Sequence, residues 1–252
     1  MDKETIQLQN RFRDLADKSY AQNIYVFTGF LSLAEQDIFL KTAGEIGHVS
    51  YRLFGGRGDC ERKMLRFGSP EDLGYEEDFP IVCIHICPLL KKFADDFTHR
   101  DFLGALMHLG IERNIMGDIF VAEQEAFLFC QEAMSFFICE KLDKVKHTHV
   151  RCEVLREGLT VPVKEPQPEE VTVSSQRADG IVARLYGLAR EKSQKLFADK
   201  KVYIDGRLAE SPSRCLKSGE LVTVRGYGRF LYQGVCYETK KGKLCIKADV
   251  YR

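Results

Sequence analysis

The chain lacks the features that mark membrane proteins, secreted disulfide proteins and metal proteins. No apolar run is long enough to cross a bilayer, and the first 18 residues are polar with a helical period, unlike a signal peptide. Its nine cysteines are odd in number and include no CxxC pair, which favours reduced thiols. We therefore expect a cytoplasmic protein with no membrane partner and no disulfide framework.

Signatures of catalysis are also missing. The glycine-rich segment 55–68 lacks the Lys-Ser/Thr ending of a Walker loop, and the triplet 99–101 lacks the accompanying motifs of a protein kinase. No glycine-rich cofactor turn follows a predicted strand. The histidines lack the spacing of a catalytic or metal-binding set (His85, His108, His147 and His149). We expect no catalytic residue, no cofactor and no metal ligand.

The chain does have enough apolar residues for a core, and its charge is unevenly distributed. Its 252 residues are 44% hydrophobic, which suits two or three modest domains of α+β structure. The formal net charge is zero, yet residues 177–252 carry 17 Lys and Arg against 8 Asp and Glu, a net of +9. The first 176 residues therefore carry −9. A compact unit this basic suits the neutralisation of nucleic-acid phosphates.

The basic region opens with two predicted helices. Ser174 and Ser175 are suited to cap the first, whose apolar residues recur at helical spacing. The second helix, over residues 190–199, has an apolar side and leaves Lys192 and Lys195 on the opposite flank. These lysines should face solvent or a ligand.

Two predicted strands follow the helices. Residues 201–205 alternate as a half-buried strand does, which predicts Lys201 and Tyr203 on its outer side. Residues 221–225 repeat the pattern and predict that Arg225 is exposed. Helix and strand periods thus place cations and an aromatic ring on the same surface. A merely solvated face is the usual explanation for an isolated charge run, but this convergence favours RNA binding.

The two short helices, the turn KVYIDG and the ending SGELVTVRGYGRF resemble the αL RNA-binding domain of ribosomal protein S-four. The resemblance implies a fold that presents basic residues to structured RNA. Two positions depart from the pattern: Asp205 stands for the usual Asn of the turn, and Lys200 for the usual Gly before the strand. We expect the RNA-binding side chains to be Arg177, Arg190, Lys192, Ser193, Lys195, Lys200, Lys201, Tyr203, Arg225 and Arg229.

Residues 1–79 are predicted to form an N-terminal α+β domain. Its glycine-rich segment GGRGDCERKMLRFG combines a flexible turn with several cations, so a second phosphate contact is predicted there. Cys60 lies beside these cations, where a reactive thiol or an inert loop cysteine would fit. The expected secondary RNA contacts are Arg57, Arg62, Lys63, Arg100 and Arg113.

Residues 80–160 are predicted to form a ferredoxin-like domain with the order strand-helix-strand-strand-helix-strand. RNA-recognition modules share this order and stack bases on sheet aromatics. Phe127 and Phe129 alternate onto one face, so base stacking there is a minority hypothesis beside the interpretation that they belong to the core. An extended Pro- and Glu-rich linker is predicted over residues 161–175, before the basic domain of residues 176–252. After residue 230 a strand hairpin is predicted, with lysines at its tip.

Three motifs in order, GGRGDCERKM, HRDFLGALMHLGIERNIMGDI and RGYGRF, resemble the YlmH family of bacterial proteins. That family combines an N-terminal domain, a central domain like an RNA-recognition module and a C-terminal S-four domain. The resemblance implies a monomeric, non-enzymatic binder of ribosomal RNA and tRNA at the large ribosomal subunit, related to factors in quality control of stalled peptidyl-tRNA complexes. An RNA-modifying enzyme, of pseudouridine synthase or methyltransferase type, is the alternative. A protein–protein adaptor using the acidic half is a third possibility.

Overall fold

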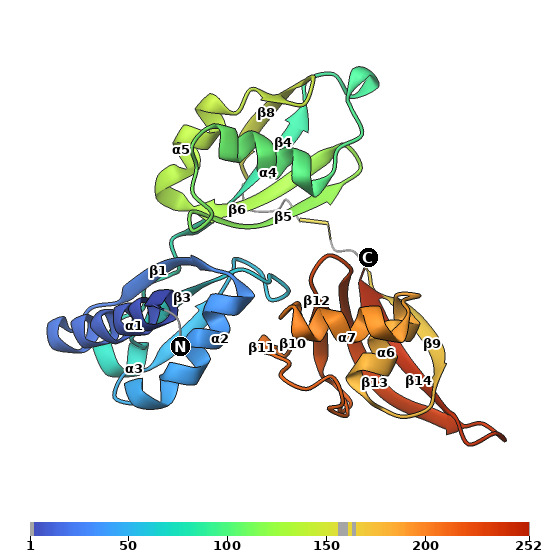
Figure 1. The fold of residues 1–252 in the computed structure, drawn as a ribbon. Helices are drawn as coiled ribbons and strands as arrows, with labels where there is room; N and C mark the ends of the chain where they lie inside the picture. The colour runs from blue at the N-terminus through green and yellow to red at the C-terminus, as the bar shows by residue number, and fades with distance from the viewer. Residues whose placement is uncertain (1–2, 156–160, 163–164, 252) are drawn as a thin grey trace. The chain divides into compact units, whose positions relative to one another are not determined.

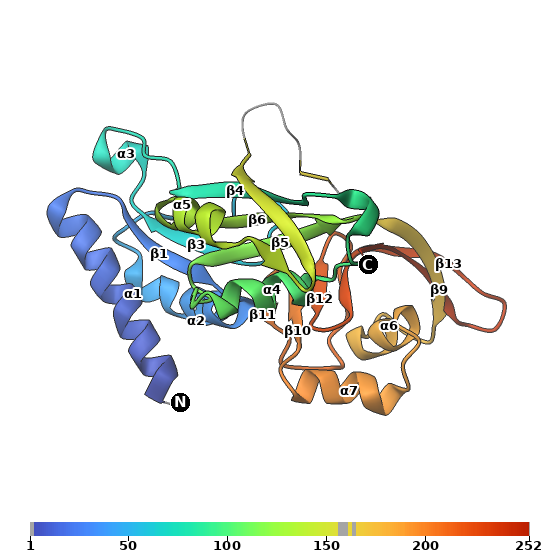
Figure 2. The same cartoon turned by 90° about the horizontal axis from the view of Figure 1, so that it is seen from above.

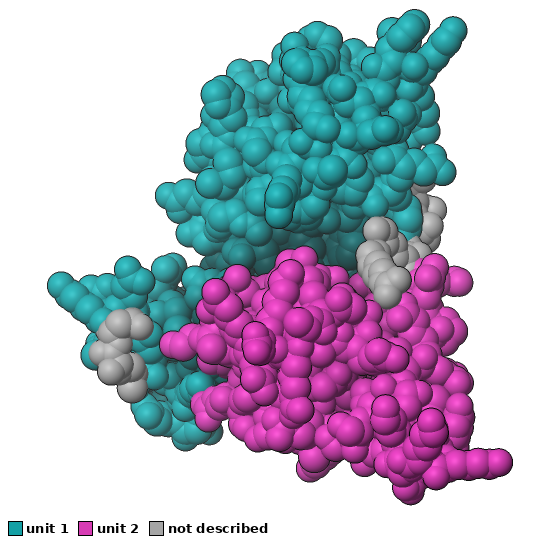
Figure 3. Space-filling model, turned by 45° about the vertical axis from the view of Figure 1, so that its right-hand side comes forward, with its two compact units in different colours: residues 1–162 teal, residues 163–252 magenta. Residues whose placement is uncertain are grey.

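The chain folds as two compact α+β units in the computed structural model, which describes residues 3–155, 161–162 and 165–251. The first unit comprises residues 1–162 and the second residues 163–252 (Figure 3). The described residues do not include 156–160, the last part of the predicted central domain, or 163–164 of the predicted linker. Each unit is built around its own sheets and core.

The first part of unit 1 is a small sheet with two helices packed on it (Figure 1). Its strand order is β1-β3-β2, with antiparallel pairs. Ser32 and Glu35 form the reciprocal capping box that the sequence pattern predicts at the start of α2. The elements are α1 (Lys3–Gln22), β1 (Val26–Leu31), α2 (Leu33–Thr42), the 3₁₀ turn η1 (Ala43–Ile46), β2 (Tyr51–Phe54), β3 (Lys63–Phe67) and α3 (Pro70–Leu73).

The second part of unit 1 has the predicted ferredoxin-like order. Its sheet runs β5-β6-β4-β8-β7 with antiparallel neighbours, the pattern that two crossed strand-helix-strand units produce. Phe102 and Leu106 of α4 and Ile138 of α5 pack with Ile84 and Leu128, so both helices cover the same sheet face. The elements are β4 (Ile81–Pro88), η2 (Lys91–Phe93), α4 (His99–His108), β5 (Met116–Ala122), β6 (Glu125–Gln131), α5 (Glu132–Lys141), β7 (Lys144–Val145) and β8 (Thr148–Val154).

Unit 2 is a six-stranded antiparallel sheet with two helices on one face (Figures 1 and 2). Its strand order is β11-β10-β12-β13-β14-β9. Ile181 of α6 and Phe197 of α7 pack with Val222, Val224 and Ile246 of the sheet. The elements are β9 (Gln167–Val173), α6 (Ala178–Leu185), α7 (Arg190–Ala198), β10 (Val202–Ile204), β11 (Arg207–Leu208), β12 (Leu221–Val224), β13 (Gly228–Glu238) and β14 (Leu244–Tyr251).

Two local expectations for unit 2 differ from the structure. The predicted linker contains strand β9, which pairs along its whole length with β14, so the extended connection is shorter than expected. Pro168 fits there because β9 is an edge strand, where a missing N–H is tolerated. Helix α6 begins after Arg177, and no side chain caps it, so Ser174 and Ser175 do not act as its cap.

Candidate nucleic-acid interface

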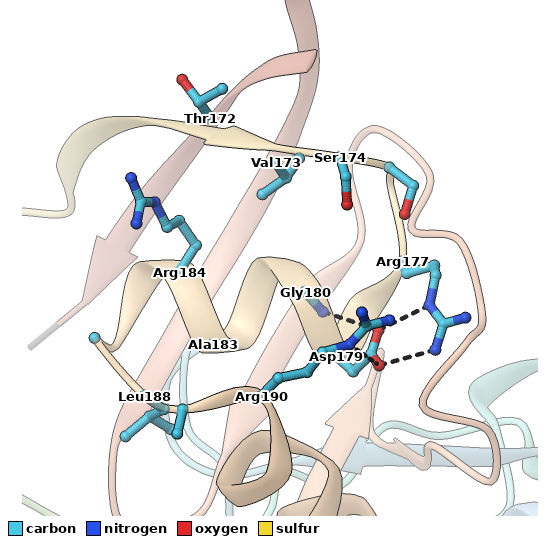
Figure 4. A pocket seen from close by; sticks show the side chains of 13 residues that line it. Thr172, Val173, Ser174, Arg177, Asp179, Gly180, Ala183, Arg184, Leu188 and Arg190 are labelled. Carbon is cyan, nitrogen blue, oxygen red and sulfur yellow. Dashed lines mark hydrogen bonds and ion pairs between the residues drawn. The ribbon is translucent and has the colours of Figure 1, made fainter. Parts of the chain in front are cut away.

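A buried carboxylate organises the start of the two helices of unit 2. Asp179 is fully buried, and its oxygens accept hydrogen bonds from Arg177 Nε at 3.0 Å and Nη2 at 2.9 Å. Gln194 Nε2 and the backbone N–H of Gly180 donate to the same carboxylate, at 3.2 and 2.9 Å. Arg190 Nε lies 3.8 Å from it (Figure 4). Asp179 thereby fixes two of the predicted RNA-binding guanidiniums, Arg177 and Arg190.

The pKa of Asp179 lies below its ordinary value. Burial on its own raises the pKa, but the hydrogen bonds from Arg177 and Gln194 and the charge of Arg177 outweigh it. The same hydrogen bond raises the pKa of Arg177. Asp179 and Arg177 are therefore both charged at neutral pH, and the carboxylate offsets part of the charge of Arg177. Arg190 keeps 64% of its side chain exposed.

Ser193 does not belong to the exposed surface, so its predicted RNA contact is wrong. Its side chain is fully buried, and its hydroxyl donates to the backbone oxygen of Asp179 at 2.8 Å. This bond joins α7 to the first turn of α6. The residue lies on the apolar side of α7 with Leu196 and Phe197, where a small polar side chain fits only because it has a partner.

A cavity of about 520 Å³ lies between β9, α6 and the start of α7. Arg184 and Arg190 line it together with Thr172, Ser174 and Ser175 (Figure 4). Its lining carries three arginines and one carboxylate, and that carboxylate is already satisfied by Arg177. Arginine and hydroxyl side chains in one lining suit an anionic group such as a phosphate, with Arg184 near one end of α6 and Arg177 and Arg190 near the other (Figure 4). Arg184 was not among the predicted RNA contacts. A cation within the apolar segment 181–185 is a signal that the sequence does offer.

The second helix and the loop after it carry the main exposed cations. Lys192, Lys195, Lys200, Lys201 and Arg225 are all exposed. Across the described part of the chain, only Lys201 among them has a carboxylate within ion-pair distance, Asp199 at 3.7 Å. The backbone N–H of Arg225 donates to the carbonyl of Lys201, which places the ends of β10 and β12 side by side. We call these five residues the α7 surface.

Lys200 has a left-handed backbone conformation, with φ of +55°. Glycine is favoured in this region because it has no Cβ, and the S-four pattern usually has glycine at this position. The helix end is closed by bonds from the N–H of Lys200 to Phe197 and of Lys201 to Leu196. Lysine at this position therefore adds a cation to the α7 surface at a conformational cost of about 1 kcal/mol.

Tyr203 lies on the opposite side of β10 from the core residues Val202 and Ile204, as predicted, but it is buried, so its predicted exposure and RNA contact are wrong. It is 2% exposed, and the guanidinium of Arg225 lies over its ring at 5.3 Å. The residues opposite it are Leu208, on the edge strand β11, and Thr223, on β12. Arg229 is half-buried with its guanidinium 4.8 Å from the ring centre of Tyr251. In both pairs the aromatic ring restricts the position of the guanidinium.

Two predicted secondary contacts, Arg57 and Arg62, are instead part of a junction inside unit 1. Arg62 donates to the backbone oxygens of Phe30 at 2.8 Å, Arg113 at 2.8 Å and Met116 at 2.9 Å. Arg57 pairs with Asp59, donates to the carbonyl of Val161 at 3.2 Å and lies 4.0 Å over the ring of Phe120. Because their donors are used by the protein itself, these two residues are corrected from RNA contacts to structural ones.

The rest of the junction seals the loop 55–62 onto the central sheet. Asp118 accepts hydrogen bonds from the backbone N–H groups of Glu61, at 2.5 Å, and Arg62, at 3.1 Å. Gly56 has φ of +97°, and a Cβ there would lie 2.3 Å from Phe129 Cδ1. The backbone of the loop is therefore in direct contact with the sheet, in a space that only glycine fits.

The sheet face opposite α4 and α5 is closed by this contact. Phe127 and Phe129 point away from those helices, yet they are only 6% and 5% exposed. His85 stacks on Phe127 with ring centres 4.8 Å apart, and Phe120 packs edge-on against Phe129 at 5.9 Å. No base can stack on these rings in this arrangement. The hypothesis of base stacking there is wrong for this structure, and the rings are buried in the junction.

The remaining predicted contacts of unit 1 differ in exposure. Arg100 is exposed on α4, and Lys63 is half-buried on β3. Arg113 is half-buried, its Nη1 has no hydrogen-bond partner among the residues described, and burial lowers its pKa. Cys60 is buried, and burial raises the pKa of its thiol to about 12, so the inert loop cysteine is the better interpretation.

Two absences hold for the part of the chain that the structure covers. No three His, Cys, Asp or Glu side chains gather there as a metal site would require. None of its helices combines the length and apolar character needed to span a membrane.

The chain has clear relatives. Residues 75–157 match the family model described as a putative RNA-binding domain in YlmH. The ribosome-associated protein quality control protein P2 of Bacillus subtilis (strain 168) is 30% identical over 221 residues, covering 86% of this chain and 83% of the relative. The structure of the cell division protein ylmH from Streptococcus pneumoniae matches with a TM-score of 0.51 and 17% identity, over 62% of this chain and 93% of that one, which shows a shared fold. Given the extent of the match to the Bacillus protein, the chain belongs to the YlmH family.

Proposed function

We propose that this protein binds structured RNA through the α7 surface of unit 2 and does so on the ribosome. The observation that carries the proposal is the set of five exposed cations on one helix and two adjoining strand ends, four of which have no carboxylate partner among the described residues. Unpaired cations repel one another, so their grouping costs stability unless an anion binds there. A phosphate backbone supplies several anions at a regular spacing, and its binding releases counterions.

Relatives support RNA binding and a ribosomal role, although the matched family model covers residues 75–157 of unit 1 and not the α7 surface. The matched family model is described as a putative RNA-binding domain, and the Bacillus relative is named as a ribosome-associated quality control protein. We propose the large ribosomal subunit and tRNA as the RNA targets, in the cytoplasm, with the protein acting as a monomer. It acts by binding rather than by catalysis: cations hold phosphates, and the shape of the RNA selects the site.

The cavity beside Asp179 extends this surface with a second class of contact. Arg190 and Arg184 present guanidiniums there, and Asp179 fixes the position of Arg190. A planar guanidinium binds a phosphate through two parallel hydrogen bonds, which selects geometry as well as charge. Lysines of the α7 surface therefore supply most of the electrostatic attraction, and the arginines of the cavity supply orientation.

The test is the salt dependence of RNA affinity for a quadruple variant, in which Lys192, Lys195, Lys201 and Arg225 are changed to Gln. Losing about four phosphate contacts should reduce the slope of log affinity against log salt by roughly 3 to 4 units. The matched control changes four exposed lysines of unit 1 to Gln, namely Lys18, Lys92, Lys141 and Lys144. It removes the same net charge, so an equal loss of slope in both variants would refute a defined site.

A further inference from the structure

The hairpin formed by β13 and β14 extends beyond the core of unit 2. Core residues of these strands end at Tyr232 and begin again at Ile246, with Leu244 partly buried beside them. Figures 1 and 2 both show the ribbon projecting past α6 and α7. The extension is therefore not explained by packing, because it buries none of the residues in the core cluster of unit 2.

The tip of this hairpin is a hydrogen-bonded turn that carries three lysines. Its turn is closed by bonds from the N–H of Thr239 to the carbonyl of Lys243, at 2.7 Å, and from the N–H of Gly242 to Thr239, at 2.9 Å. The hydroxyl of Thr239 also accepts a bond from the N–H of Lys243 at 3.0 Å. Lys240, Lys241 and Lys243 are exposed, and within the described residues no carboxylate lies within ion-pair distance of them. Three unpaired cations are thus held close together.

The tip and the α7 surface lie at opposite ends of β13. Arg225 precedes the turn that starts this strand, and the hairpin turn follows its last residue, Glu238. At about 3.3 Å per residue, the 11 residues of β13 separate the two groups of cations by roughly 30 Å. That distance is about four Debye lengths at physiological salt, so the two groups do not act as one electrostatic site.

We propose that the hairpin tip is a second RNA-backbone contact, which binds phosphates of the same RNA that occupies the α7 surface. The proposal rests on the proposed function, since it takes RNA as the ligand. A bound stem must then extend along β13 for roughly 30 Å. Two separate contacts on one RNA raise the overall affinity, because the second contact forms within a complex that the first already holds together. They also fix the direction of the RNA on the sheet.

The experiment measures the affinity of the full chain for an RNA stem of about 16 base pairs over a range of salt. The tip variant changes Lys240, Lys241 and Lys243 to Gln, and its control changes Lys18, Lys92 and Lys144 to Gln. We expect the slope of log affinity against log salt to fall by roughly 2 to 3 units in the tip variant, and not in the control. When the tip change is combined with the quadruple α7 variant, the two losses of slope should add, because the sites are separate.

The possible results separate this inference from the proposed function. If the α7 variant loses slope and the tip variant does not, the hairpin contact is refuted and the RNA function stands. If neither variant loses slope more than its control, the RNA function is refuted together with the hairpin contact. A loss of slope in the tip variant that is matched by the three-lysine control would also overturn the hairpin contact, since it would reflect net charge only.

Discussion

Replacing Asp179 with Asn should destabilise unit 2 and weaken RNA binding together, because one buried carboxylate fixes both helices and two guanidiniums. The change keeps the side-chain volume but removes the charge that accepts bonds from Arg177 and Gln194. A hydrogen bond to a charged group contributes about 1.5 to 3 kcal/mol. Arg177 keeps 35% of its side chain exposed and regains water, which discounts the loss. We expect the free energy of unfolding of unit 2 to fall by about 2 kcal/mol.

Urea unfolding read by amide hydrogen exchange in α6 measures this loss for unit 2 by itself. A double-mutant cycle with Arg177→Met isolates the pair, and a coupling energy of about 1 kcal/mol or more is expected. A loss below about 0.5 kcal/mol with no coupling would refute the account of Asp179, since surface substitutions alone produce changes of that size.

The pH dependence gives a second readout of the same residue. The pKa of Asp179 in the folded protein lies below its ordinary value of 3.8, so the carboxylate contributes stability above the unfolded pKa. That contribution is lost as pH falls through the folded pKa. The Asp179→Asn variant should therefore lose less stability than the wild type between neutral and strongly acidic pH. Parallel acid-unfolding curves would contradict the assignment.

Three further predictions concern the junction, the α7 surface and the buried thiol. Gly56→Ala should lower the free energy of unfolding of unit 1 by about 2 kcal/mol or more, because a Cβ would meet Phe129 and φ is +97°; unchanged urea unfolding would contradict the tight contact. Lys200→Gly should stabilise unit 2 by about 1 kcal/mol and yet reduce the salt slope by roughly 0.7 to 0.9 units, as measured by unfolding and RNA titration. Cys60, with its pKa raised to about 12, should react with a thiol reagent at pH 8 more slowly than the exposed Cys215. Mass spectrometry of timed samples measures the two rates, and equal rates would contradict the burial of Cys60.

Local periodicity predicted the features that depend on residues close together in the sequence, namely element type and the exposure of helix flanks. The helical spacing of the basic region gave α6 and α7, and the apolar flank of α7 placed Lys192 and Lys195 outward, as the structure has them. The order of strands and helices in the central domain was also readable, because each element there has its own period. Element type and the exposure of helix flanks are thus set by short-range patterns.

The predictions that failed concern residues whose contacts come from distant parts of the sequence. Alternation predicted an exposed Tyr203 because it assumes that one sheet face meets solvent, but Tyr203 is buried, and the guanidinium of Arg225, just after β12, lies over its ring. Arg62 looked like a phosphate ligand because its partners are backbone carbonyls, which leave no trace in the side-chain pattern. Arg57 has a carboxylate partner close by in the sequence, Asp59, but its bond to the carbonyl of Val161 could not be read from the sequence. Strand β9 was hidden in a Pro-rich segment because its pairing partner, β14, is at the far end of the chain.

The most direct test of the central claim is crosslinking and sequencing of RNA bound in cells, with sedimentation across a ribosome gradient followed in parallel. The wild-type protein should crosslink to large-subunit ribosomal RNA and tRNA and sediment with the large subunit. The α7 variant with Lys192, Lys195, Lys201 and Arg225 changed to Gln should lose both, while the four-lysine control of unit 1 retains them. Crosslinks scattered over free RNA, or ribosome association that survives in the α7 variant, would contradict the account.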